Sequence, residues 1–154
     1  MAGSDDIIFE MGLYQAALPV RLRYSDIHFW FDTRNQDGRE LTRCGLTTYA
    51  ARLLSDVFRL EWKVYVGQVL TDAELLGEIE STKANSELYS PMPGKLADIN
   101  SSIVDDPSLI GIGPYEAWLL EFEGVPGVSM SAAEYHKFLA DGWEETQKML
   151  KGQM

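Results

Sequence analysis

Short segments in which apolar and polar or aromatic residues alternate recur along most of this chain, with turn signals between them. The clearest of them are 19–24, 27–31, 39–44, 60–66, 75–79, 85–91, 95–100 and 118–122. Alternation of this kind is typical of half-buried β-strands, and the pair Asp37 and Gly38 suits a tight hairpin between two of them. Turn signals at such short intervals predict a mainly β chain, folded as a sandwich or barrel.

A short helix interrupts this pattern after the first strands. Either Thr47 or Thr48 can cap it, because a threonine side chain accepts a hydrogen bond from the first helical turn. Tyr49, Leu53 and Val57 then follow at helical spacing, which predicts an apolar face that lies against a sheet.

The end of the chain has a different pattern. Ser131 and Glu134 form a capping box, a signature of a helix N-terminus. The residues that make an apolar stripe beyond it are Tyr135, Phe138, Leu139, Trp143, Met149 and Leu150. We expect this helix to dock on the sandwich. Residues 1–154 are therefore predicted to form a single domain, with a core over about 20–123 and a C-terminal helix over about 131–150.

Composition excludes several classes of function. Thirteen basic against 24 acidic residues give a net charge of −11, which disfavours nucleic acid as a partner. Cys44 is the single cysteine and there are two histidines, so no internal disulfide and no usual zinc cluster is expected, and no metal. No apolar run has the length of a membrane span or a signal peptide, so no membrane partner is expected and the expected location is the cytoplasm. No catalytic triad or acid–base pair stands out, so the chain is not expected to be an enzyme.

The most distinctive stretch is the turn 80–84, which reads Glu-Ser-Thr-Lys-Ala. Strand-like segments flank it on both sides, so Lys83 is expected at or near the tip of a hairpin. A lone surface lysine is usually a solvated charge. Here the predicted position holds the amine away from the body of the protein, where another enzyme can reach it.

This turn and its flanks resemble the lipoyl-lysine turn of the glycine cleavage system H protein family. The matching positions are Glu80, Lys83, Ala84, Ser86, Glu87, Tyr89, Ser90, Pro91 and Gly94, with Gly77 as the small residue before the hairpin. Residues 24–30, 45–50 and 131–145 are similar to further motifs of that family, so the resemblance covers most of the chain.

The resemblance implies a lipoyl-type β-sandwich or flattened barrel, with a short helix after the first strands and a C-terminal helix. It implies lipoate bound by an amide to Lys83, in a carrier that holds and orients the cofactor while the cofactor performs the chemistry. Its implied site residues are His28, Phe29 and Glu87 as neighbours of the lipoyl arm, and Glu80, Ala84 and Gly77 as recognition points for the attaching enzyme. That enzyme would be a lipoate ligase or a lipoyl/octanoyl transferase.

Two positions depart from the family pattern. Phe29 stands where the resemblance expects a glutamate that helps to hold the aminomethylated arm, and Ile27 is apolar. A charge-assisted hydrogen bond of this kind contributes about 1.5–3 kcal/mol. The departures favour a carrier of sulfur, similar to the lipoate-binding proteins of heterodisulfide-reductase-like sulfur oxidation, with that complex as partner. The alternatives are an H protein that carries the aminomethyl group between glycine cleavage enzymes, and a docking module without lipoate.

Two further residues have both a functional and a structural interpretation. His28 either orients the arm or is hydrogen-bonded into the structure, and the second is favoured. Cys44 either exchanges with the dithiol or is a small buried hydrophobe in its strand, and the second is again favoured.

Overall fold

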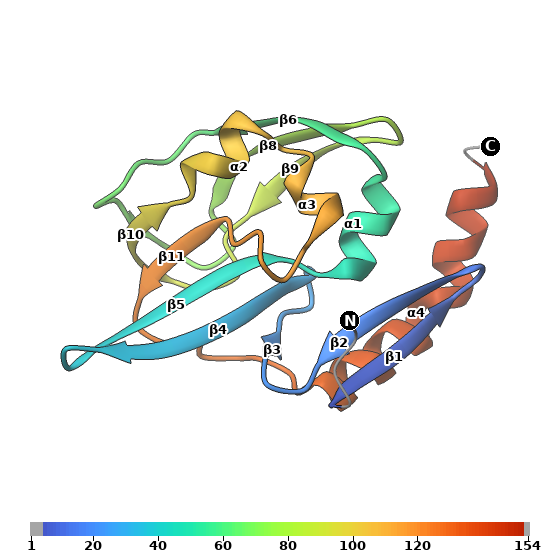
Figure 1. The fold of residues 1–154 in the computed structure, drawn as a ribbon, viewed down its shortest axis with the longest axis horizontal. Coiled ribbons are helices and arrows are strands. Elements are labelled where there is room, and N and C mark those ends of the chain that lie inside the picture. The colour runs from blue at the N-terminus through green and yellow to red at the C-terminus, as the bar shows by residue number, and fades with distance from the viewer. Residues whose placement is uncertain (1–4, 153–154) are drawn as a thin grey trace.

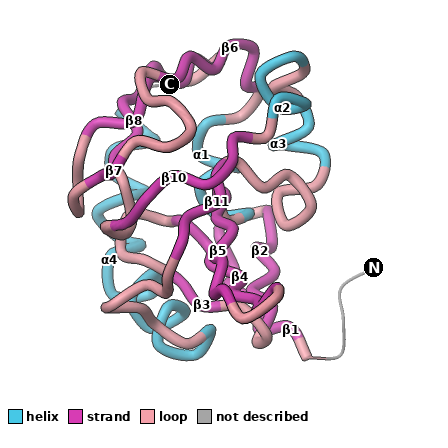
Figure 2. The backbone as a smooth tube through the Cα atoms, turned by 90° about the vertical axis from the view of Figure 1, so that its left-hand side faces the viewer, coloured by secondary structure: helices cyan, strands magenta, loops and turns pink. Residues whose placement is uncertain are grey.

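A computed structural model of the chain describes residues 5–152, with side chains up to residue 149 (Figure 1). The strands are β1 (Asp6–Met11), β2 (Tyr14–Pro19), β3 (Arg23–Tyr24), β4 (Phe29–Gln36), β5 (Arg39–Leu46), β6 (Val57–Trp62), β7 (Val69–Leu70), β8 (Leu75–Ser81), β9 (Asn85–Tyr89), β10 (Gly94–Ile99) and β11 (Leu120–Glu123). The helices are α1 (Thr48–Leu54), α2 (Ser101–Asp105), α3 (Leu109–Ile112) and α4 (Ala132–Gly152). In Figure 2, α2 and α3 lie together at one edge of the strands and α4 at another.

Two sheets form a sandwich. A six-stranded sheet in the order β3-β4-β5-β11-β10-β7 faces a three-stranded sheet in the order β6-β8-β9. The main cluster of buried side chains draws on both sheets, with Phe29, Phe31 and Phe122 from the larger one and Leu60 and Ile79 from the smaller. The mainly β sandwich expected from the alternating segments is confirmed.

Local signals in the sequence position the first hairpin and the first helix as expected. Asp37 and Gly38 have φ angles of 54° and 80°, which is the left-handed geometry that a two-residue hairpin turn requires. The Thr47 side chain accepts from the Ala50 N–H at 3.3 Å and caps α1. The helix then turns its residues Tyr49 and Ala51 inward.

A second hydrophobic cluster lies outside the sandwich. There β1 and β2 form an antiparallel hairpin, and α4 packs mainly on β1. Tyr135 and Leu139 of α4 are buried against residues of this hairpin, among them Phe9 and Leu18. The predicted capping box is present, since Ser131 N–H donates to a Glu134 carboxylate oxygen at 2.8 Å and Glu134 N–H donates to Ser131 Oγ at 3.1 Å.

Several sequence predictions were wrong in detail. The C-terminal helix docks chiefly on the N-terminal hairpin rather than on the sandwich. Met149 is 67% exposed and does not join the buried stripe, and the side chain of Leu150 lies outside the described residues. The segment 19–24 is not one strand. Strand β2 ends at Pro19, and the Leu22 N–H donates a hydrogen bond to the Pro19 carbonyl oxygen at 3.3 Å, which makes a turn. Strand β6 begins at Val57, so this residue is not part of the predicted helix.

Gly77 of β8 is required by a close approach of two strands. A Cβ there would lie 2.1 Å from the backbone oxygen of Glu61 on β6. The variant Gly77→Ala is expected to lower the free energy of unfolding by about 3 kcal/mol, because a strand must shift. As a control, Gly142→Ala in α4 meets nothing within 4 Å and is expected to add about 1 kcal/mol. Urea denaturation measures both, and an unchanged midpoint for Gly77→Ala would contradict this packing.

Candidate functional site

Lys83 lies in the turn that joins β8 to β9. The two strands pair up to Glu80 opposite Asn85, so the turn consists of the few residues between them. The Lys83 side chain is exposed, and within the described part of the chain it has no hydrogen-bond or ion-pair partner. Its amine is therefore available to a second protein.

Ser81 holds the base of this turn. Its hydroxyl donates to the carbonyl oxygen of Ala84 at 2.7 Å and accepts from the Ala84 N–H at 3.1 Å. The Ser81 N–H donates to the same carbonyl oxygen at 3.0 Å. Three hydrogen bonds between the residues that flank Thr82 and Lys83 leave the backbone of the turn little freedom.

The turn is also bound to the segment between α1 and β6. Thr82 N–H donates to the carbonyl oxygen of Asp56 at 3.0 Å, and Asp56 N–H donates to Thr82 Oγ1 at 3.3 Å. No pattern in the sequence predicts this contact, because it joins residues 26 positions apart. An exposed lysine side chain therefore extends from a backbone that hydrogen bonds hold in place, which is the arrangement that a covalently attached cofactor arm requires.

The residues predicted to guide the attaching enzyme lie on the same hairpin. Glu80 accepts from Arg59 Nη1 of the neighbouring strand at 3.0 Å, and Ala84 is exposed in the turn. Glu87 is exposed on the edge strand β9, opposite Glu78. Gly77 has the packing role described above, which explains a glycine there without any contact to an enzyme.

Among the described residues, neither His28 nor Phe29 forms a hydrogen bond, ion pair or ring contact with Glu87. Phe29 is 1% exposed and packs in the main core. His28 faces α4, where its Nδ1 lies 2.8 Å from the Tyr135 hydroxyl. That hydroxyl is also 2.9 Å from Thr47 Oγ1. The structural interpretation of His28 accounts for these contacts, and the role of the three residues as neighbours of an arm stays a prediction.

Burial changes the protonation of His28. Desolvation lowers the pKa of this imidazole from 6.5 to about 4, and the nearby Asp26 carboxylate offsets only part of the effect. Burial also raises the pKa of the Tyr135 hydroxyl, so this phenol stays protonated and can donate to the neutral imidazole. The group is a neutral polar network that joins the residue before β4 and the N-cap of α1 to α4.

This network predicts a pH dependence of stability. Below pH 6.5 the unfolded chain binds a proton at His28, whereas the folded chain binds this proton only near pH 4, because the pKa of His28 is lowered there. The contribution of His28 to the free energy of unfolding is therefore fully present above pH 6.5, and it falls by up to about 3 kcal/mol as the pH drops to 4. Urea denaturation of the wild type and of His28→Gln, each at pH 7 and at pH 4.5, measures this contribution. An identical loss in both proteins would contradict it.

Cys44 lies in β5 and is fully buried. Burial raises the pKa of its thiol, so the thiolate that disulfide exchange requires is disfavoured. The interpretation of Cys44 as a small core residue is confirmed, and exchange with an external dithiol is not supported by its position.

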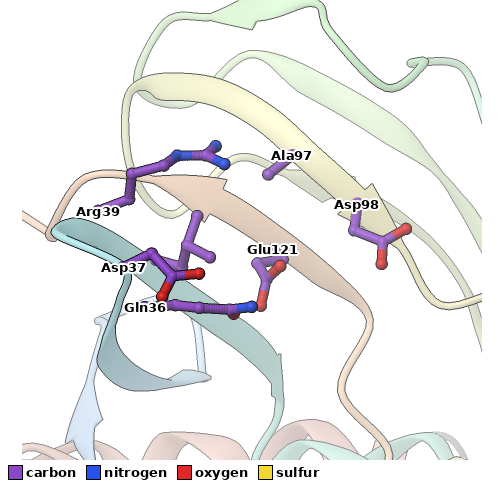
Figure 3. Close-up of a pocket in the computed structure, with 7 residues that line it drawn as sticks. Gln36, Asp37, Arg39, Ala97, Asp98 and Glu121 are labelled. Carbon is purple, nitrogen blue, oxygen red and sulfur yellow. The ribbon is translucent and has the colours of Figure 1, made fainter.

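Two hollows lie away from the turn of Lys83. One, of about 390 Å³, is bordered by Gln36, Asp37, Arg39, Ala97, Asp98 and Glu121 (Figure 3). It lies beside the β4–β5 hairpin, at the opposite end of the molecule from the β8–β9 turn (Figure 1). Glu121 there forms ion pairs with Arg34 at 2.8 Å and with Arg43 at 3.0 Å.

The second hollow, of about 350 Å³, lies between α4 and the start of α1 and includes His28 and Tyr49. Over residues 5–152, no helix has the length and apolar character needed to cross a bilayer. Within the same residues, no three His, Cys, Asp or Glu side chains are arranged so that they could hold a metal ion.

Comparison with known proteins finds relatives that match most of the chain. The family model described as "Glycine cleavage H-protein" matches residues 22–151. The glycine cleavage system H protein of Streptomyces avermitilis is 40% identical over 123 residues, which cover 78% of this chain and 95% of that protein. The H protein of Mycobacterium tuberculosis is 37% identical over 107 residues, or 69% of this chain and 77% of that one. A crystal structure of the H protein from Mycobacterium marinum superimposes with a TM-score of 0.68 at 30% identity, and covers 81% of this chain and 98% of that one.

Proposed function

This chain belongs to the glycine cleavage H-protein family, and on that premise we propose that Lys83 is the lysine on which it carries lipoate. Proteins of this family carry a covalently attached lipoate on a lysine, and they are carriers rather than catalysts. The sandwich with its C-terminal helix is the lipoyl-type fold of the family. The observation that carries the proposal is an exposed lysine, without a partner among the residues that the structure describes, on a turn that Ser81 and Asp56 hold in place.

The residues of the turn suit a carrier. Formation of an amide removes the charge of Lys83, and no ion pair is lost, because none is made in the described part of the chain. The hydrogen bonds of Ser81 and Thr82 fix the point from which the arm extends. A lipoyl group on Lys83 would supply a dithiolane ring, whose S–S bond opens to two thiols when it takes up electrons, can carry a group on one sulfur, and forms again when the electrons leave.

The cargo that the relatives favour is the aminomethyl group of glycine cleavage, with the enzymes of that system as partners. A second candidate, a sulfur cargo exchanged with a heterodisulfide-reductase-like complex, is favoured by one observation. Phe29 occupies the position where the resemblance expects a carboxylate, and it is buried in the core. An aminomethyl ammonium on the arm would find no anionic partner in this side chain.

The two cargoes are separated by glycine–bicarbonate exchange. The lipoylated chain is incubated with a glycine decarboxylase, beside a lipoylated H protein from one of the relatives as reference. We expect exchange by this chain, at a rate lowered by the missing carboxylate. Absence of exchange, together with uptake of sulfur from a persulfide donor, would replace the first cargo by the second. Phe29→Glu is a poor probe, because it places a carboxylate in an apolar core.

The remaining parts of the proposal concern attachment and location. A lipoate ligase or a lipoyl/octanoyl transferase would modify the chain, and the cytoplasm stays the predicted location. A docking module without lipoate is the competing interpretation of the same fold. Intact mass of the protein produced with lipoate available separates the two, since only a carrier gains the mass of a lipoyl group.

A further inference from the structure

Strand β6 contains a β-bulge beside the turn of Lys83. Val57 pairs with Ser81 and Arg59 pairs with Glu80, so Phe58 between them has no partner on β8. A bulge of this kind turns a side chain in a new direction, and bulges are frequent beside functional sites. The Phe58 side chain is 60% exposed, although burial of an aromatic ring contributes a large favourable free energy.

Phe58 is close to the lysine turn through the backbone. Its neighbour Val57 is paired with Ser81, the residue that holds the base of the turn. Asp56, one residue further, exchanges two hydrogen bonds with Thr82. An exposed aromatic ring and an exposed lysine are thus fixed on adjoining, mutually bonded segments.

The exposed side of the same three-stranded sheet is acidic. Glu61, Glu78 and Glu87 are directly opposite one another across the three strands. Arg59 bonds to Glu80 and Glu61, and Lys63 lies 3.4 Å from Glu78, which leaves an excess of negative charge. A protein surface that matches this face presents an apolar pocket with a basic rim, because complementary charge steers and orients association.

We propose that Phe58 is the apolar anchor by which the lipoate-attaching enzyme recognises the Lys83 turn. The proposal rests on Lys83 as the attachment site. In the step concerned, the Lys83 nitrogen forms an amide bond with the lipoyl carbonyl carbon. The bond from that carbon to the phosphate of an acyl-nucleotide, made from ATP and lipoate, breaks, and the nucleotide monophosphate leaves while a proton passes to solvent. Phe58 takes no part in this chemistry and acts through binding.

The enzyme is favoured over the chain's own lipoyl arm as the occupant of this surface. The arm is apolar and uncharged, so it would use the ring and leave the row of glutamates without a partner. A protein surface uses both, with an aromatic residue as the central contact and a charged rim around it.

The test measures initial rates of lipoylation by a lipoate ligase with ATP and lipoate, as the concentration of unmodified chain is varied. The variants are Phe58→Ala, the larger apolar Phe58→Leu, and the control Tyr65→Ala. Tyr65 is 67% exposed and lies beyond the other end of β6. We expect Phe58→Ala to raise KM about tenfold with little change in kcat. Phe58→Leu should recover part of the loss, and Tyr65→Ala should match the wild type. Melting curves establish that the variants are folded.

Equal KM values for wild type and Phe58→Ala would overturn the inference, and so would an equal rise for Tyr65→Ala. Lipoylation of Phe58→Ala at the wild-type rate, together with faster reduction of its attached dithiolane, would show that the Phe58 ring covers the lipoyl arm. That result would also overturn the inference. No lipoylation of the wild type, where a relative's H protein is modified, would instead remove the proposed function itself.

Discussion

A chain that ends after Gly127 is expected to lose most of its stability, because α4 covers the second hydrophobic cluster. Tyr135 stacks on Tyr24 with ring centroids 4.7 Å apart, and both rings are fully buried. The Tyr135 hydroxyl forms hydrogen bonds with His28 and Thr47. Without α4 these groups, and the apolar side of the β1–β2 hairpin, face water.

The expected size of the loss follows from the side chains that α4 buries. Burial of a large apolar side chain contributes about 1.5–3 kcal/mol. Tyr135 and Leu139, with the surface they cover, therefore account for about 5 kcal/mol or more, against the 5–15 kcal/mol of a typical domain. Thermal unfolding followed by circular dichroism should show a much lower melting temperature. The control Met149→Ala removes a side chain that is 67% exposed and should change nothing. A truncated chain that melts with the full-length protein would show that α4 does not stabilise the fold.

Elements that depend on local signals were predictable from the sequence. The turn at Asp37 and Gly38 needs two left-handed residues, and Asp-Gly supplies them. The helix after Thr47 and the helix after Ser131 each begin at a capping residue whose side chain bonds within three positions. In all three cases the residues that decide the geometry are neighbours in the chain.

Elements that depend on distant partners were not predictable in the same way. The apolar stripe of α4 indicated that a helix packs on something, but the sequence did not say that its partner is a hairpin more than a hundred residues earlier. The spacing of Val57 fits a helix of 3.6 residues per turn, whereas pairing with Ser81 places it in a strand. The bulge at Phe58 follows from the same pairing, so the sequence pattern does not predict it.

In the candidate site, too, local features were predictable from the sequence and contacts between distant residues were not. The position of Lys83 at a hairpin tip follows from two strands and a short turn, and the sequence contains both. The contacts between Thr82 and Asp56 and the burial of Phe29 depend on how α1, β4 and β6 pack. The identity of Phe29 was visible in the sequence, while its place in the core was not.

The second large effect concerns the attachment site. Lys83→Arg should abolish lipoylation, because a guanidinium stays protonated at any accessible pH and does not act as the acylated amine. The substitution keeps the positive charge and a similar length, so the turn held by Ser81 should remain intact. Lys95→Arg is the matched control, since Lys95 lies on β10 and outside the turn. The control should be modified as the wild type is.

The most direct measurement is the mass of the wild-type chain and of its peptides after incubation with lipoate, ATP and a lipoate ligase. We predict a gain of one lipoyl group, located on the peptide that contains Lys83, and none in Lys83→Arg. A lipoyl group on any other lysine, or no modification under conditions that load a relative's H protein, would contradict the assignment of Lys83 as the carrier residue.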